Sequence, residues 1–205
     1  MTQRIIGLTG GIATGKTTVA NYLASAYQFP ILDADTYARE AVQPGSIVLQ
    51  KIVERYGPAV LLPDGTLNRA HLGNIIFQDS GERVWLETQI HPYVRHCFQT
   101  KLKALVEHPV VVLVVPLLFE AKMTDLVTEI WVVDCPQAEQ VERLMQRNHL
   151  TLEQAQARIT SQLATQEKAA QATFVLDNSS TPAPWLRQVD KILSGSPKSL
   201  GDQCA

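Results

Sequence analysis

Apolar residues gather in five short runs along the chain, separated by polar or helix-forming stretches. The runs cover residues 4–9, 30–35, 110–115, 129–134 and 174–177. They are continuous rather than alternating, which is typical of strands covered on both faces. The helical segments between them favour parallel strands joined by right-handed crossovers. The pattern therefore predicts an α/β fold built on a five-stranded parallel sheet.

Helical periodicity appears between the runs. Residues 16–27 place apolar side chains on one face. Further helices are predicted at 47–56, about 82–90, 93–106 and about 184–193. Pro92 is expected to end one helix and start the next, and Pro136 to be the first residue of another. Thr151 and Gln154 have the spacing of a capping box. The stretch from 36 to 106 is far longer than one crossover needs, so we expect a helical insertion there.

Composition narrows the class of protein. The chain has 205 residues, of which 45% are hydrophobic, and this suits one compact α/β domain with small insertions. The net charge of −2 argues against nucleic-acid binding through a global basic field. Cys97, Cys135 and Cys204 have neither disulfide nor metal-ligand spacing, which favours a reducing cytoplasm. No apolar stretch is long enough to span a membrane.

A glycine-rich stretch with one lysine joins the first apolar run to the first predicted helix. It reads Gly10-x4-Gly15-Lys16-Thr17, the phosphate-loop pattern in its expected strand-loop-helix context. Glycines let the loop wrap closely around phosphate oxygens and point backbone N–H groups at them. The helix adds the positive end of its dipole. Lys16 is expected to reach the β- and γ-phosphates and Thr17 to ligate Mg²⁺. The loop predicts binding of a nucleoside triphosphate.

Two aspartates end the second apolar run, in LDADTYAR. The carboxyl ends of strands line the ligand crevice of a doubly wound sheet, and Asp33 and Asp35 would share one face of a strand. A carboxylate there can accept a proton from an attacking hydroxyl or hold a water on Mg²⁺. We assign Asp33 to the site, whereas Asp35 is either a second site acid or a helix N-cap. Asp134 precedes a helix and is given a cap or structural role.

Two groups of charged residues have both a structural and a functional interpretation. Arg143 and Arg147 share a helix face. Together with Arg158 they are either solvated or part of a lid that closes over ATP, and we favour the lid for Arg143 and Arg147. His91 and Arg95, in HPYVR, either face a substrate or simply flank a helix end.

Blocks that lie in order over residues 4–180 resemble the dephospho-CoA kinase family. They are GLTGGIATGKTT (7–18), LDADTYARE (32–40), VQPG (42–45), HP (91–92) with Arg95, VPLLFE (115–120), the segment 141–162 and ATFVLDNSS (172–180). The resemblance implies a P-loop NTPase fold of the nucleoside-monophosphate-kinase type, with three α/β/α layers, a helical CoA domain and a lid. It also implies that ATP, with Mg²⁺, phosphorylates the ribose 3′-hydroxyl of dephospho-CoA, giving CoA and ADP.

Carried over by position, the resemblance implies roles for individual residues. Asp33 matches the family's base, and Arg143 and Arg147 match its lid arginines. Asn178 matches a position near the adenine of ATP. The acceptor side comprises Asp33, Asp35, Arg39, His91 and Arg95. The phosphate loop comprises Gly10, Gly11, Ala13, Thr14, Gly15, Lys16, Thr17 and Thr18.

The loop departs from the family at two positions. The family usually reads GGIGSGKS or GGIGSGKT, and here Ala13 and Thr14 replace Gly-Ser. Because Ala13 carries a Cβ, its backbone is not expected at positive φ. Both residues are small, so we expect the loop to keep its phosphate-binding conformation.

These roles divide the chain into a core, an insertion and a lid. The nucleotide-binding core is 1–35, 107–136 and 171–193, the CoA-binding insertion 36–106, the lid 137–170 and a flexible tail 194–205. A kinase for a nucleoside monophosphate or another small acceptor is the main alternative, and LDAD with VQPG argues against it. A GTP-dependent switch would need Asn-Lys-x-Asp, which the sequence lacks. A nucleic-acid-dependent ATPase does not suit the net charge.

Overall fold

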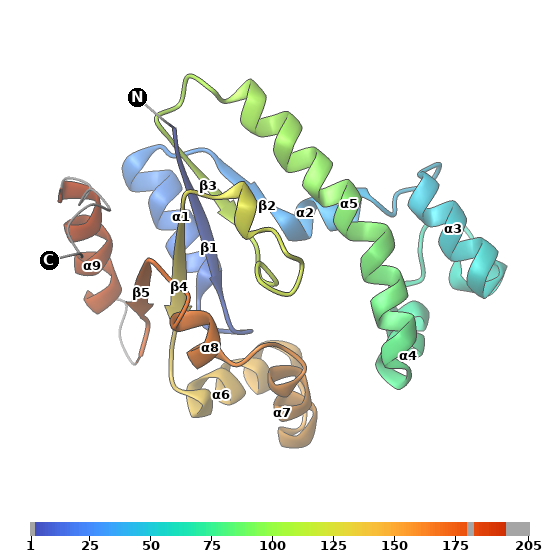
Figure 1. Ribbon diagram of the computed structural model, residues 1–205. Helices are drawn as coiled ribbons and strands as arrows, with labels where there is room; N and C mark the ends of the chain where they lie inside the picture. Colours follow the sequence, from blue (N-terminus) through green and yellow to red (C-terminus); the bar gives the residue numbers. More distant parts are fainter. Residues whose placement is uncertain (1–2, 180–182, 196–205) are drawn as a thin grey trace, which may run out of the picture. The chain divides into compact units, whose positions relative to one another are not determined.

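The computed structural model describes residues 3–179 and 183–195, and Figure 1 shows its ribbon. The chain forms two compact units. The first comprises Met1–Thr9 with Thr18–Ile130, and the second comprises Gly10–Thr17 with Trp131–Ala205. The predicted flexible tail lies outside the described residues from position 196 onward.

A five-stranded sheet with the order β2-β3-β1-β4-β5 organises the fold. Its strands are β1 (Arg4–Gly10), β2 (Ile31–Asp33), β3 (Val110–Val114), β4 (Glu129–Asp134) and β5 (Phe174–Asp177). The pairs β1–β3, β2–β3 and β4–β5 are parallel. Every residue of β3 is buried, as the continuous apolar run predicts. The predicted five-stranded parallel sheet is confirmed, although β2 ends at Asp33, before the predicted end of its run.

The helices follow the predicted order with three differences. They are α1 (Lys16–Tyr27), α2 (Ala34–Glu40), α3 (Ile47–Tyr56), α4 (Arg69–Gln78), α5 (Ser80–Ala104), α6 (Gln137–Asn148), α7 (Leu152–Thr160), α8 (Thr165–Ala169) and α9 (Ala183–Ser194), with 3₁₀ turns at Pro58–Val60 and Thr124–Leu126. Helices α4 and α8 were not predicted. Pro136 is the N-cap of α6 rather than its first residue. The capping box of Thr151 and Gln154 is present at the start of α7.

The third difference is at Pro92, which lies inside α5 rather than between two helices. A proline in a helix interior removes one backbone hydrogen bond and crowds the preceding turn. Both halves of α5 are nevertheless held by packing. Leu86 belongs to the apolar cluster with α3 and α4, while Val94 and Phe98 belong to the cluster on β2 and β3. Tertiary packing of this kind, rather than local propensity, supplies most helical stability.

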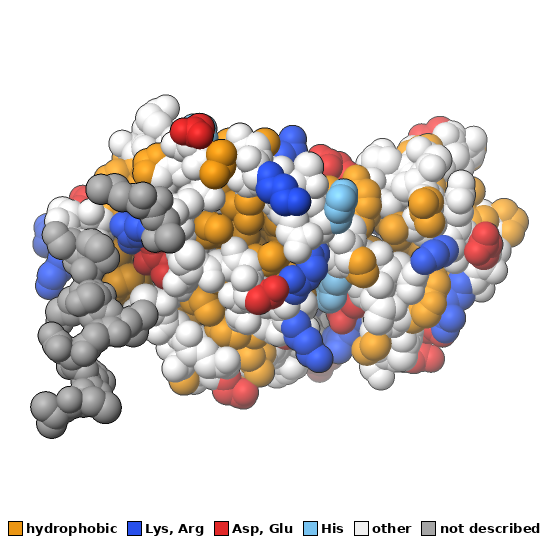
Figure 2. All heavy atoms as spheres, turned by 45° about the horizontal axis from the view of Figure 1, so that its top comes forward, with side chains coloured by type: hydrophobic (Ala, Val, Ile, Leu, Met, Phe, Trp, Pro, Cys, Tyr) orange, Lys and Arg blue, Asp and Glu red, His pale blue; other side chains and the backbone are white. Residues whose placement is uncertain are grey.

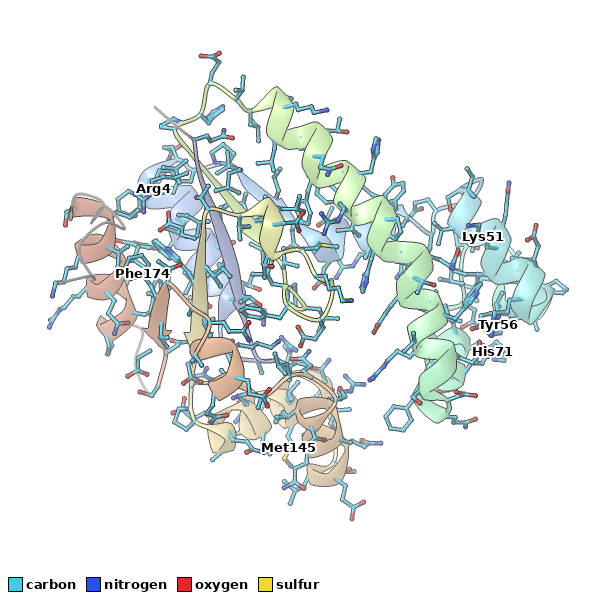
Figure 3. All side chains as sticks on the ribbon, in the orientation of Figure 1. Arg4, Lys51, Tyr56, His71, Met145 and Phe174 are labelled. Atoms are coloured by element: carbon cyan, nitrogen blue, oxygen red, sulfur yellow. The ribbon has the colours of Figure 1, made fainter. Side chains whose placement is uncertain are left out.

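Each unit has its own buried apolar side chains. In the first unit, α3 and α4 pack beside the N-terminal half of α5, and α2 packs beside its C-terminal half (Figure 1). In the second unit, Trp131, Val133, Leu144 and Leu176 are fully buried. The Trp131 ring meets the ring of Phe174 edge to face at 5.9 Å, and Figure 3 labels Phe174 on β5.

The surface is mixed in character. On the face shown in Figure 2, basic and acidic side chains are interspersed with apolar ones.

A helix that crosses a bilayer needs about 20 consecutive apolar residues. None of the helices in the described part of the chain meets this requirement.

Candidate functional site

The phosphate loop joins β1 to α1 and folds back on its own lysine. The Nζ atom of Lys16 donates to the carbonyl oxygens of Gly10 and Gly11 at 3.1 and 2.7 Å. The Thr14 hydroxyl donates to the Gly11 oxygen at 2.9 Å. An ammonium group is therefore held against the loop at the N-terminus of α1, where the helix dipole also favours an anion.

Two loop glycines are required by close contacts as well as by conformation. Gly10 has φ 146°, and a Cβ there would lie 2.3 Å from the Val133 carbonyl oxygen. Gly15 has φ 99°, and a Cβ there would lie 2.1 Å from Nδ2 of Asn178. A residue with a side chain cannot occupy either position without moving its surroundings.

The expected backbone of Ala13 is wrong, because its φ is 61°. This left-handed conformation crowds the Cβ of an ordinary residue against its own backbone and persists only where the surroundings enforce it. The carbonyl oxygen of Ala13 accepts a hydrogen bond from Nη1 of Arg143 at 3.4 Å. The loop thus keeps, with an alanine, a conformation that a glycine would adopt more easily.

Asn178 and Arg143 both contact the loop from segments distant in the sequence. The Asn178 side chain is 8% exposed and donates to the Thr14 carbonyl oxygen at 2.8 Å. Its backbone N–H donates to the carbonyl oxygen of Asp134 at 2.8 Å. Nη2 of Arg143 donates to the Asn178 carbonyl oxygen at 3.1 Å and to Oε2 of Glu139 at 2.7 Å. The contact of Asn178 with adenine stays a prediction.

The other arginines of the predicted lid lie in different surroundings. Arg147 is exposed near the end of α6, and its Nε donates to the side chain of Asn148 at 3.0 Å. Arg158 is exposed in the last turn of α7. The structure therefore brings Arg143 to the loop, whereas Arg147 and Arg158 face solvent.

Gln162 also contacts the phosphate loop, although no pattern in the sequence singles it out. Its Oε1 accepts a hydrogen bond from the backbone N–H of Ile12 at 3.0 Å. Gln162 lies on the link between α7 and α8, within a block that carries the family resemblance. A glutamine on an irregular link has no periodicity or spacing that would reveal a partner so far away in the sequence.

A cavity of about 770 Å³ adjoins this part of the second unit. Its lining includes Asp134, Cys135, Gln140, Thr165 and Asp177. Burial raises the pKa of Asp134; the backbone N–H of Cys135 opposes this rise, and the Asp177 charge adds to it. Of the two roles predicted for Asp134, a cap or a structural one, the cap is wrong, because the N-cap of α6 is Pro136, with no side-chain hydrogen bond. Burial also raises the pKa of Cys135 to about 11, so its thiol stays protonated at neutral pH.

The predicted acid Asp33 ends β2 and is the N-cap of α2. Its Oδ1 accepts from the backbone N–H of Asp35 at 2.7 Å. Asp35 itself lies in the first turn of α2, beyond the strand, so the expectation that both carboxylates share one strand face is wrong. The strand ends at Asp33 because helix α2 begins there. The Asp33 side chain accepts a hydrogen bond from one of the backbone N–H groups at the start of that helix.

A second cavity, of about 340 Å³, lies within the first unit. Its lining includes Asp35, Arg39 and Arg69 and is otherwise apolar, with Leu67, Leu72, Ile76 and Leu86 among its members. Both arginines are exposed. Arg69 could not be selected from the sequence because helix α4, which begins there, has only a weak apolar pattern.

His91 and Arg95 lie on α5, outside the lining of this cavity. Burial lowers the pKa of His91, and the charge of Glu87 opposes this. Arg95 forms a bidentate ion pair with Asp125, with N–O distances of 2.7 and 3.0 Å. This pair holds the pKa of the Asp125 carboxyl below its usual range. Arg95 is thus engaged in an ion pair within its own unit, and its acceptor role stays a prediction.

The described residues contain no cluster of three or more His, Cys, Asp or Glu side chains that could hold a metal ion. A metal that arrives with a nucleotide needs fewer protein ligands, because phosphate oxygens and waters supply the rest. Thr17 lies in the first turn of α1 with its side chain exposed. Its hydroxyl fits the Ser/Thr ligand that the phosphate loop supplies to Mg²⁺ in such proteins.

The fold and the loop together define a class. A phosphate loop follows the first strand of a parallel α/β sheet, and its lysine lies at the start of the next helix. This is the arrangement of a P-loop nucleotide-binding protein.

Comparison with known proteins narrows the class to a family. The family model for dephospho-CoA kinase matches residues 4–183. A dephospho-CoA kinase of Trichormus variabilis is 65% identical over 95% of this chain and 98% of its own. The crystal structure of TT1252 from Thermus thermophilus has a TM-score of 0.80 and 32% identity, covering 97% of this chain and all of that one. A dephospho-CoA kinase from Campylobacter jejuni has a TM-score of 0.67 and 26% identity, covering 92% of this chain and 96% of that one. The chain belongs to the dephospho-CoA kinase family, whose members are kinases that use ATP as the phosphate donor.

Proposed function

We propose that this chain transfers the γ-phosphate of ATP to the ribose 3′-hydroxyl of dephospho-CoA, giving CoA and ADP. The observation that carries the proposal is the phosphate loop. Lys16 lies against the loop at the start of α1, in a chain that matches the family model from residue 4 to 183. The sequence blocks on the acceptor side favour dephospho-CoA over a nucleoside monophosphate.

On the donor side, Lys16 neutralises the triphosphate as a mobile point charge. To do so, its ammonium exchanges contacts with the loop carbonyls for contacts with the β- and γ-phosphates. Mg²⁺, held by the Thr17 hydroxyl and the phosphates, would neutralise charge on the transferred group. Arg143 lies beside the loop and is suited to hold the phosphoryl group, with Arg147 one turn further along α6.

On the acceptor side, Asp33 orients and deprotonates the 3′-hydroxyl for in-line attack. The 340 Å³ cavity is suited to the rest of the substrate. Its apolar wall matches the pantetheine arm, and the guanidinium groups of Arg39 and Arg69 match the diphosphate. Asp35 belongs to the same lining.

The proposed reaction assigns a task to each predicted segment. The core, 1–35 with 107–136 and 171–193, binds nucleotide. The insertion, 36–106, binds the acceptor, and the lid, 137–170, contributes arginines and excludes water. We assign the reaction to the cytoplasm, which suits the free thiols of Cys97 and Cys135.

The test of the reaction is a panel of acceptors. ADP formation from Mg-ATP is measured with dephospho-CoA, AMP, CMP, adenosine and no acceptor. We expect turnover with dephospho-CoA alone, with CoA as the product. Turnover with AMP or CMP would overturn the acceptor assignment, and equal turnover without any acceptor would identify an ATPase instead.

The test of the base is the substitution Asp33→Asn. We expect turnover to fall about 10²-fold or more, with ATP binding nearly intact. Asparagine caps helices about as well as aspartate, so α2 stays capped and the loss reports on chemistry. Asp33→Ala should lose the same activity and, in addition, about 1 kcal/mol of stability. Asp35→Asn is the matched control: a larger loss there would make Asp35 the base.

A further inference from the structure

Ala13 has a strained backbone that side chains hold from both directions. Its φ of 61° is unfavourable for an alanine. The N–H of the preceding residue, Ile12, donates to Oε1 of Gln162 at 3.0 Å. The carbonyl oxygen of Ala13 accepts from Arg143 at the longer distance of 3.4 Å. Backbone strain survives where surrounding contacts over-determine it, and these two contacts flank the strained residue.

Gln162 is one of several side chains that pack closely against the phosphate loop. Thr165 and Gln140 pack against Gly11 of the same loop. A Cβ at Gly11 would lie 2.8 Å from Oγ1 of Thr165 and 2.9 Å from Oε1 of Gln140. Gln140 is 4% exposed, and its Oε1 has no hydrogen-bond partner among the described residues. Gly11 does not have positive φ, so close packing, rather than conformation, is the reason for glycine there.

Gln162 and Arg143 differ in their other interactions. Arg143 also pairs with Glu139 and donates to the Asn178 carbonyl oxygen. In the proposed reaction, its guanidinium group holds the transferred phosphoryl group. The bond from Ile12 to Gln162 lies on a backbone amide and carries no charge.

We propose that Gln162 is a positioning residue for ATP: through the Ile12 N–H it holds the adjacent Ala13 of the phosphate loop in its left-handed conformation, ready to receive phosphate. This inference rests on the nucleotide-binding part of the proposed function. It has a specific corollary, because glycine adopts positive φ without strain. With glycine at position 13, the loop needs Gln162 much less.

The experiment is a double-mutant cycle on the full chain. The variants are Gln162→Met, Ala13→Gly and the two combined, and calorimetry measures the dissociation constant of ATP for each. Methionine keeps the length of the side chain and removes the acceptor. We expect Gln162→Met to weaken ATP binding about tenfold with Ala13 present, and about twofold with glycine at position 13. Gln156→Met, an exposed substitution on α7, is the matched control and should leave binding unchanged.

A second readout reports on the contact directly. Amide exchange of Ile12, followed by NMR, should become faster in Gln162→Met. It should stay slow in Gln162→Glu, which keeps an acceptor oxygen. These expectations concern the free protein and do not depend on turnover.

The outcomes separate the alternatives. Equal losses of ATP affinity with alanine and with glycine at position 13 would mean that Gln162 merely supports the α7–α8 link, and would overturn the inference. Unchanged exchange of the Ile12 amide would do the same. An unmodified protein that binds no ATP would overturn the proposed function as well. ATP binding without turnover of dephospho-CoA would overturn only the acceptor assignment.

Discussion

Gly15 illustrates how tightly single atoms constrain the phosphate loop. A Cβ at this position would lie 2.1 Å from Asn178, the side chain that holds the Thr14 carbonyl. We expect Gly15→Ala to weaken ATP binding about 10²-fold and to lower stability by about 2–3 kcal/mol. Calorimetric titration with ATP and urea unfolding measure the two effects.

Gly65→Ala separates backbone strain from collision. Gly65 has φ 80°, and a Cβ there would meet nothing within 4 Å. This variant should lose only about 1 kcal/mol and keep its affinity for ATP. If Gly65→Ala and Gly15→Ala lost the same stability, the contact with Asn178 would not be the reason for the glycine.

The residues of the loop could be predicted because their chemical types and spacing are sufficient to define it. The side chains that support the loop could be predicted only in part. Arg143 and Asn178 were selected as site residues, although their contacts with the loop backbone were not foreseen. Gln162 was missed, because an amide group on an irregular segment leaves no periodic signal. Ala13 was predicted wrongly because local sterics were weighed without the contacts that enforce its conformation.

At the scale of elements, α3 and α5 are joined by a cluster of polar and aromatic side chains. Arg55 pairs with Glu82 through two bonds at 2.6 and 2.8 Å, and its guanidinium lies 4.6 Å from the Trp85 ring. The Tyr56 hydroxyl donates to Glu82 at 2.5 Å. Tyr56, the last residue of α3, is labelled in Figure 3. The hydrogen bond from Arg55, followed by that from Tyr56, lowers the pKa of Glu82 to about 2.

This shift predicts how the α3–α5 contact responds to acid. A carboxyl whose pKa is lower in the folded state stabilises the fold above its ordinary pKa of 4.5, and this contribution fades as the pH falls toward about 2. We expect Glu82→Gln to lower the urea midpoint at pH 6, with a smaller difference from the unmodified protein at pH 3. Glu87→Gln, whose ion pair with Arg83 is longer at 3.9 Å, should have little effect at either pH.

Most elements could be predicted, because the apolar runs and helical periods are strong over their lengths. Helix α5 and helix α4 were harder for opposite reasons. Pro92 is a strong local signal that packing on both halves of α5 overrides. In α4, whose residues are all described, Leu72 alone is buried, so the periodicity of this helix is weak.

At the scale of the whole molecule, nucleotide binding should be visible as stability. A ligand that binds only the folded state adds about 2.7 kcal/mol at 100 times its dissociation constant. We expect ATP to raise the unfolding midpoint of the unmodified protein and of Asp33→Asn by similar amounts. Gly15→Ala should lose this response. A loss of the response in Asp33→Asn would place that carboxylate among the groups that bind ATP.

The contacts that hold the phosphate loop span long distances along the chain. Thr14 and Asn178 are 164 residues apart, and Ile12 and Gln162 are 150 apart. Synthesis proceeds from the N-terminus, so the ribosome makes the loop before the residues that support it. A nascent chain that stops before β5 contains the phosphate loop and Gln162 but lacks Asn178. Affinity for ATP is therefore acquired late in translation, and ATP gives truncated chains little protection from proteolysis.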